Sequence, residues 1–203
     1  MAVEWFPENF ASMPADIPIV AFLLGAYGSS KDYYCKQIAQ TVSKRGWRIA
    51  IINRRGFGYH HIATQNFCSG EEFADFSFTL KQIKEIFQKA EIYLMGVSAG
   101  ANLSSKYLGL YGNDTPVKAC VSISNPYNIG RISFTMKHNR MANFFSRVLA
   151  SEYKRILNFH CDNPLFEGLI KEKYGELNYL REKLENTNTC WKLDKLLTSK
   201  LTG

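Results

Sequence analysis

The sequence lacks the features that direct a protein into or across a membrane. The longest apolar run in its 203 residues spans 19–26, far short of the ~20 residues that a transmembrane helix needs. The N-terminal stretch MAVEWFPENF has neither a basic region nor a long apolar segment, so it does not resemble a signal peptide. Apolar residues make up 46% and charged residues 21%, which excludes a disordered chain. We expect a compact, cytoplasmic protein.

Paired cysteines and clusters of metal ligands are also missing. The five cysteines, Cys35, Cys68, Cys120, Cys161 and Cys190, are scattered and form no CxxC pair. Such spacing fits neither a disulfide framework nor a zinc site. We therefore expect thiols in a reducing compartment, no metal and no other cofactor.

The net charge of +7 is not gathered into a dense basic run. Residues 1–130 carry 12 Lys and Arg against 10 Asp and Glu, whereas residues 131–203 carry 13 against 8. The excess is interleaved with glutamates, which indicates a solvated helical face. Attraction to an anionic lipid surface is the alternative. We expect no nucleic-acid partner and keep open a peripheral contact with a membrane.

Short apolar runs alternate with helical patterns over the first 130 residues. Strand-like runs occupy 17–24, 47–53, 91–97 and 117–123. Between them, apolar residues recur at helical spacing in 32–44, 73–90 and 99–110. Helix-length crossovers between strands produce a parallel sheet covered on both faces. We predict an α/β fold with a mostly parallel sheet for residues 1–130.

From residue 131 onward the pattern is helical throughout. Amphipathic patterns occupy 144–159, 165–175 and 177–185, and no apolar run there has the character of a strand. We predict that residues 131–203 form a separate helical segment. A helical segment in this position forms either a lid over an active site or ordinary structural packing.

The clearest chemical signal is the pentapeptide Gly96-Val97-Ser98-Ala99-Gly100, a GxSxG motif. It follows an apolar strand and opens a helical pattern, as a nucleophile elbow requires. Small residues two positions away let the serine occupy a strained turn, and the head of a helix favours negative charge on a reacting oxygen. We therefore predict Ser98 as a catalytic nucleophile. The alternative is a plain glycine-rich turn between a strand and a helix.

The loop Gly25-Ala26-Tyr27-Gly28 follows the first predicted strand and fits the same chemistry. Acyl transfer needs two backbone N–H donors aimed at the oxyanion, one after the nucleophile and one from an earlier strand's loop. We predict Ala99 and Ala26 as these donors. A phosphate-binding loop is disfavoured, because Walker A and GxGxxG motifs are both absent.

Four segments together resemble the α/β-hydrolase superfamily, and within it the AB hydrolase 4 family of lipases and esterases. They are LLGAYGSS, RGWRIAIINRRGFG, LMGVSAGANLSSKYLG and VSISNPYNI, in the family's order over residues 17–129. The resemblance implies hydrolysis of carboxylic, lipid-like acyl esters. It also implies that residues 131–203 are the lid, and that Gly96 and Gly100 are the elbow glycines.

The same resemblance implies a triad acid and a histidine on later strands, and those strands are missing from the sequence. Without a base, Ser98 is a weak nucleophile. His60, His61, His160 and Asp162 are weak candidates for a substitute. The alternative function is therefore a catalytically incomplete α/β-hydrolase-like scaffold that binds a partner or a lipid.

Overall fold

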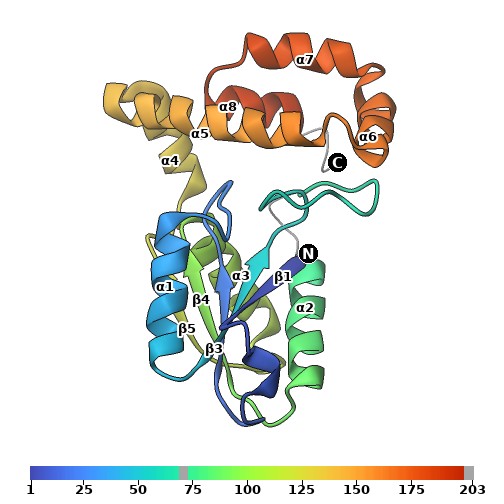
Figure 1. The fold of residues 1–203 in the computed structure, drawn as a ribbon. Helices are drawn as coiled ribbons and strands as arrows, with labels where there is room; N and C mark the ends of the chain where they lie inside the picture. Colours follow the sequence, from blue (N-terminus) through green and yellow to red (C-terminus); the bar gives the residue numbers. More distant parts are fainter. Residues whose placement is uncertain (69–72, 199–203) are drawn as a thin grey trace. The chain divides into compact units, whose positions relative to one another are not determined.

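The computed structural model describes residues 1–68 and 73–198 (Figure 1). The described residues form two compact units. One unit, the sheet unit, contains residues 1–54 and 73–127, and the other, the helical unit, contains residues 55–68 and 128–198. The loop 55–68 is thus grouped with helices that lie far away in the sequence.

The sheet unit is built on five strands in the order β1-β3-β2-β4-β5. The strands are β1 (Ala2–Phe6), β2 (Ile19–Leu23), β3 (Arg48–Asn53), β4 (Ile92–Val97) and β5 (Val117–Ile123). β1 runs antiparallel to β3, and the other neighbouring strands are parallel. Leu23 pairs with Ile52 and with Gly96. The C-terminal ends of β2, β3 and β4 therefore lie side by side at the same end of the sheet.

Helices cover both faces of this sheet (Figure 1). α1 (Tyr33–Lys44) packs on one face, and α2 (Phe73–Ile86) and α3 (Ala99–Tyr111) pack on the other. A short 3₁₀ turn, Phe10–Ser12, follows β1. The predicted α/β fold with a mostly parallel sheet is therefore confirmed.

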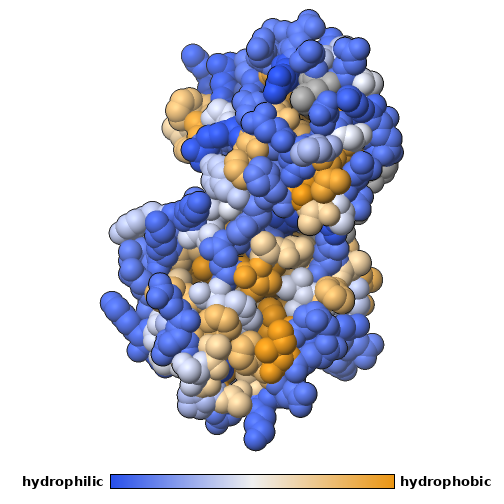
Figure 2. Space-filling view, turned by 45° about the vertical axis from the view of Figure 1, so that its right-hand side comes forward, coloured by the Kyte–Doolittle hydropathy of each residue, from blue (hydrophilic) through white to orange (hydrophobic). Residues whose placement is uncertain are grey.

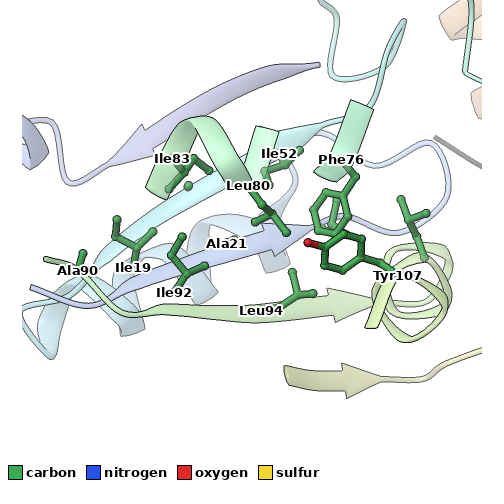
Figure 3. Packing of buried hydrophobic residues seen from close by; sticks show 13 residues of the cluster. Ile19, Ala21, Ile52, Phe76, Leu80, Ile83, Ala90, Ile92, Leu94 and Tyr107 are labelled. Carbon is green, nitrogen blue, oxygen red and sulfur yellow. The ribbon is translucent and has the colours of Figure 1, made fainter. Parts of the chain in front are cut away.

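Alternate residues of β2 pack into the two halves of the core, one on each face of the sheet. Ile19, Ala21 and Leu23 pack with α2 and α3, whereas Val20 and Phe22 pack with α1. Figure 3 shows the first half, where Phe76 and Leu80 of α2 meet Tyr107 of α3 over the strands; the Phe76 and Tyr107 ring centroids are 4.9 Å apart. All five β2 residues are buried, as expected for a central parallel strand.

The helical unit contains no strand among its described residues. Its helices are α4 (Ile129–His138), α5 (Arg140–His160), α6 (Pro164–Tyr174), α7 (Leu177–Glu185) and α8 (Cys190–Leu193), followed by a π-helical turn, Asp194–Thr198. Asn128, Asn139 and Asn163 cap the first three by accepting hydrogen bonds from backbone N–H groups. In the described part of the chain, no helix is both long and apolar enough to cross a membrane.

Among the described elements, the sequence patterns do not predict β1, α4, α8 or the short turns Phe10–Ser12 and Asp194–Thr198. β1 is a five-residue edge strand whose Trp5 and Phe6 pack on opposite sides of the sheet, and α4 has no buried residue. α4 nevertheless carries Ile129, Ile132 and Met136 at helical spacing, so the sequence pattern could have indicated it. The predicted helix 144–159 starts earlier, at Arg140, because Asn139 supplies its cap.

Candidate active site

Ser98 lies at the junction of β4 and α3 with a strained backbone. Its φ is 52° and its ψ is −117°, a combination that residues other than glycine rarely adopt. Its N–H donates to the carbonyl of Ile123 at 2.9 Å, and its own carbonyl accepts from the N–H of Asn102 at 3.0 Å. The neighbouring strand β5 and the helix α3 therefore hold the turn in place, with the half-buried serine at the start of α3.

The two glycines of the motif lie where no side chain fits. A Cβ on Gly96 would lie 2.6 Å from the Cα of Ala101 and from the carbonyl oxygen of Gly100. A Cβ on Gly100 would collide with the carbonyl oxygens of Leu23 and Leu24. Glycine at both positions thus lets α3 start directly against β2 and β4.

The loop after β2 passes beside the serine. A Cβ on Gly25 would lie 3.6 Å from Ser98 Cβ, and the Gly28 N–H closes the turn onto the Gly25 carbonyl at 3.1 Å. Within the described sheet unit, the N–H groups of Ala26 and Ala99 donate no hydrogen bond. Two free donors thus flank the strained serine from two different elements.

Tyr34 holds this loop from α1 and was missed by the sequence analysis. Its hydroxyl accepts a hydrogen bond from the Gly25 N–H at 3.4 Å and lies 2.9 Å from where a Cβ on Gly28 would be. Burial raises the pKa of this hydroxyl to about 12, so it stays protonated. In the sequence Tyr34 is one residue of the helical pattern 32–44, and nothing in that pattern signals this contact.

Asn125, in the loop after β5, joins that loop to α3. Its amide donates to the carbonyl of Ala101 at 3.2 Å and to the hydroxyls of Ser105 and Ser122 at 2.9 Å each. Asn102 in turn donates to the Pro126 carbonyl at 3.2 Å. Asn125 lies in the segment VSISNPYNI that carries the family resemblance, and its bonds position the end of β5 to which the Ser98 N–H is bonded.

The sheet unit contains no histidine, since all four occur at positions 60, 61, 138 and 160. Ser98 Oγ has no hydrogen-bond partner within the described sheet unit. His160 is fully buried, with its Nε2 2.7 Å from the Gly56 carbonyl, and His61 stacks on Phe159. No histidine therefore accompanies the serine inside its own unit.

A half-buried serine on a strained strand–helix turn, next to two free backbone amides, is the arrangement found in serine hydrolases with an α/β sheet. The comparison with family models agrees with the fold. Residues 18–187 match the model described as the alpha/beta hydrolase fold, and the chain belongs to this family.

Curated relatives match over part of their length. Embryogenesis-associated protein EMB8 of Picea glauca is 30% identical over 162 residues, 79% of this chain and 35% of the relative. Monoacylglycerol lipase of Saccharomyces cerevisiae is 24% identical over 192 residues, 92% of this chain and 40% of the relative. The chain thus spans less than half the length of either relative.

A solved structure supports the same fold. Est1E from Butyrivibrio proteoclasticus, with bound ferulic acid, superposes with a TM-score of 0.53 at 18% identity, covering 66% of this chain and 53% of that one. At this identity the likeness concerns the fold alone.

Proposed function

We propose that this chain carries the nucleophile and oxyanion hole of a serine hydrolase that cleaves carboxylic esters. The observation that carries the proposal is the strained Ser98, flanked by the free amides of Ala26 and Ala99 and approached by Gly25. Gly96 and Gly100 make the turn sterically feasible. Lipid-like acyl esters are the proposed substrates, on the support of the yeast relative's name, monoacylglycerol lipase.

The chemistry assigns each group a role. Ser98 Oγ attacks the acyl carbonyl and forms the C–O bond of an acyl-enzyme, while its proton passes to a base. The Ala26 and Ala99 amides donate to the oxygen that becomes negative in the tetrahedral intermediate. Collapse of the tetrahedral intermediate breaks the ester C–O bond, and the alcohol leaves with the proton that the base had taken from Ser98. Water then hydrolyses the acyl-enzyme, which releases the carboxylic acid and restores the serine hydroxyl. No cofactor takes part.

The triad acid and histidine are proposed to lie outside these 203 residues. In support, the sheet unit has no histidine, and the chain spans 35–40% of the two relatives quoted above. The helices within 131–203 are proposed as the lid of the same enzyme.

Covalent labelling tests the nucleophile. In the natural protein that contains this chain, a fluorophosphonate probe is expected to modify Ser98, and Ser98→Ala is expected to abolish labelling. Ser12→Ala is the matched control, since Ser12 is an exposed serine of the same unit whose hydroxyl donates to the Asn9 carbonyl, and it should leave labelling unchanged. Labelling that survives Ser98→Ala would place the nucleophile elsewhere. The 203-residue chain alone should label at least about a hundredfold more slowly, because it lacks the base.

The second candidate is a non-catalytic scaffold that binds a partner or a lipid. It is favoured by one observation, the absence of a hydrogen-bond partner for Ser98 Oγ within the described sheet unit. The natural protein would then resist the probe while remaining folded. That outcome would replace the hydrolase proposal with the scaffold.

A further inference from the structure

The helices α4 and α5 expose a row of large apolar side chains. On α5, Met141, Phe144, Phe145 and Val148 are 73%, 63%, 57% and 46% exposed, and Phe134 on α4 is 65% exposed. Figure 2 shows that apolar patches interrupt a surface that is mostly hydrophilic. Burying such side chains is favourable, so a row of them in water is unusual on a free helix pair.

The α5 row lies on the side of the helix away from its packing face. Residues 141, 144, 145 and 148 follow the i, i+3, i+4, i+7 spacing of one helical stripe. The buried residues of the same helix, including Ser146, Ala150, Tyr153 and Leu157, fall on the opposite side. The row is therefore not needed for the packing of α5 against its own unit.

The charges beside the first part of this row are positive, and the first acidic residue of α5, Glu152, follows one turn beyond Val148 and pairs with Arg155 at 2.9 Å. Residues 115–151 contain no Asp or Glu, and they include Arg131, Lys137, Arg140 and Arg147. On α5, Arg140 and Arg147 flank the apolar stripe on one edge, since they precede Met141 and Val148 by one residue each.

A groove lies at the junction of the two helices. It has a volume of about 350 Å³ and is lined by Lys137, His138, Asn139, Arg140, Asn143, Phe144 and Arg147. Three cationic side chains thus line a hollow beside the exposed Phe144 ring, and the Nζ of one of them, Lys137, also lies 5.3 Å from the centroid of the Trp191 ring. Phosphate groups are bound by such clusters, and aromatic rings favour the boundary between headgroups and acyl chains.

From this arrangement we infer that one face of α4 and α5 binds the surface of a membrane containing anionic phospholipids. This α4–α5 docking face consists of the apolar residues Phe134, Met141, Phe144, Phe145 and Val148 and the cationic residues Lys137, Arg140 and Arg147. The apolar stripe inserts at the headgroup boundary, and the cationic groove receives lipid phosphates. A binding surface on an acidic protein is the competing occupant, and the test below separates the two.

Vesicle sedimentation with the 203-residue chain tests the inference. The chain should bind phosphatidylcholine vesicles containing about a third phosphatidylserine, and bind pure phosphatidylcholine vesicles much more weakly. Replacing Arg140 and Arg147 together with Gln should weaken binding to the anionic vesicles about tenfold or more. Replacing Phe144 and Phe145 together with Ser should weaken it at least about tenfold as well.

Matched controls come from the sheet unit. Phe78→Ser with Ile86→Ser removes two apolar side chains of similar exposure, 64% and 69%, and Lys44→Gln with Arg45→Gln removes two exposed cations. Both should bind as the unaltered chain does. All replaced side chains are exposed, so the variants should give the same circular dichroism and melting temperature.

Four results would overturn the inference. The first is no binding to the anionic vesicles by a folded, monomeric chain, which is the result expected if the face binds an acidic protein. The others are equal binding to both vesicle types, loss of binding in the sheet-unit controls, and self-association in solution that the Phe144/Phe145 variant abolishes without any vesicle binding. The test does not depend on catalysis, since Ser98→Ala should bind vesicles normally even if the hydrolase proposal fails.

Discussion

At Gly100 the backbone of α3 approaches β2 so closely that a methyl group has no room. The obstructing atoms are the carbonyl oxygens of Leu23 and Leu24, which are fixed in the central strand and its end. A rigid backbone cannot give way as the tip of a flexible side chain can. We predict that Gly100→Ala lowers the free energy of unfolding by about 2–4 kcal/mol, at the upper end of overpacking effects.

Gly109 provides the control on the same helix. It lies in the interior of α3, and a Cβ there would meet nothing within 4 Å. Gly109→Ala should therefore raise the free energy of unfolding by about 0.5–1 kcal/mol, because alanine loses less backbone entropy in a helix. Urea titration of both variants measures the difference. Equal effects in the two variants would contradict the prediction, because they would show that the lack of space at Gly100 has no energetic cost.

At the scale of single residues, the sequence could indicate Ser98 but not its supports. The GxSxG pattern predicts a turn at the end of a strand, and the structure has one. The contacts of Tyr34 with Gly25 and of Asn125 with α3 join positions 9 and 20 or more residues apart. Such pairings depend on how the elements pack, and no local pattern encodes them.

The helices and strands could be predicted from the spacing of apolar residues wherever one face of the element is buried. β2 to β5 and α1 to α3 match their predicted ranges to within a few residues, because each contributes an apolar row to the core. Arg48 shows the limit of this reasoning. The sequence pattern places Arg48 in an apolar strand but does not indicate that its fully buried guanidinium donates hydrogen bonds to the carbonyls of Phe10, Met13, Pro14 and Ile17.

The contact between α5 and the loop 55–68 depends on a buried histidine. His160 Nε2 donates to the Gly56 carbonyl, and its Nδ1 is buried with no partner in the described residues. Burial lowers the pKa of this ring, with the neighbouring His61 acting in the same direction and the Gly56 bond opposing both. A second proton on Nδ1 would have no acceptor, so the folded chain keeps the ring neutral.

This pKa shift predicts a loss of stability in weak acid. The unfolded histidine titrates near 6.5, and the folded one titrates lower, so below about pH 6.5 the unfolded chain binds the extra proton. The stabilisation is complete above that pH and declines as the pH falls toward the folded pKa. We expect the free energy of unfolding to fall by up to about 1.4 kcal/mol per pH unit from this group.

His160→Gln should remove this dependence while keeping a donor for the Gly56 carbonyl. Urea titrations between about pH 7.5 and pH 5 should then show a flatter profile than that of the unaltered chain. His138→Gln is the control, since His138 is exposed and should leave the profile unchanged. An unchanged slope in the His160 variant would assign the acid sensitivity to other groups.

For the whole molecule, the uncovered edge of the sheet matters most. β5 pairs with β4 on one side and is an edge of the described sheet. Val121 lies opposite Met95 and Ile123 opposite Val97, yet the two β5 side chains are 52% and 39% exposed. Parallel strands are normally buried on both faces, and open apolar edges promote association.

We therefore predict that the 203-residue chain self-associates through β5. Sedimentation velocity over about a hundredfold range of concentration should show a sedimentation coefficient that rises with concentration. Val121→Lys with Ile123→Lys should leave a monomer across most of that range, because charges on an edge strand oppose pairing. Tyr33→Lys with Leu110→Lys replaces two exposed apolar residues on helices, 78% and 66% exposed, and should still associate. A monomer at every concentration for the unaltered chain would contradict the prediction and would mean that the β5 edge is protected in solution.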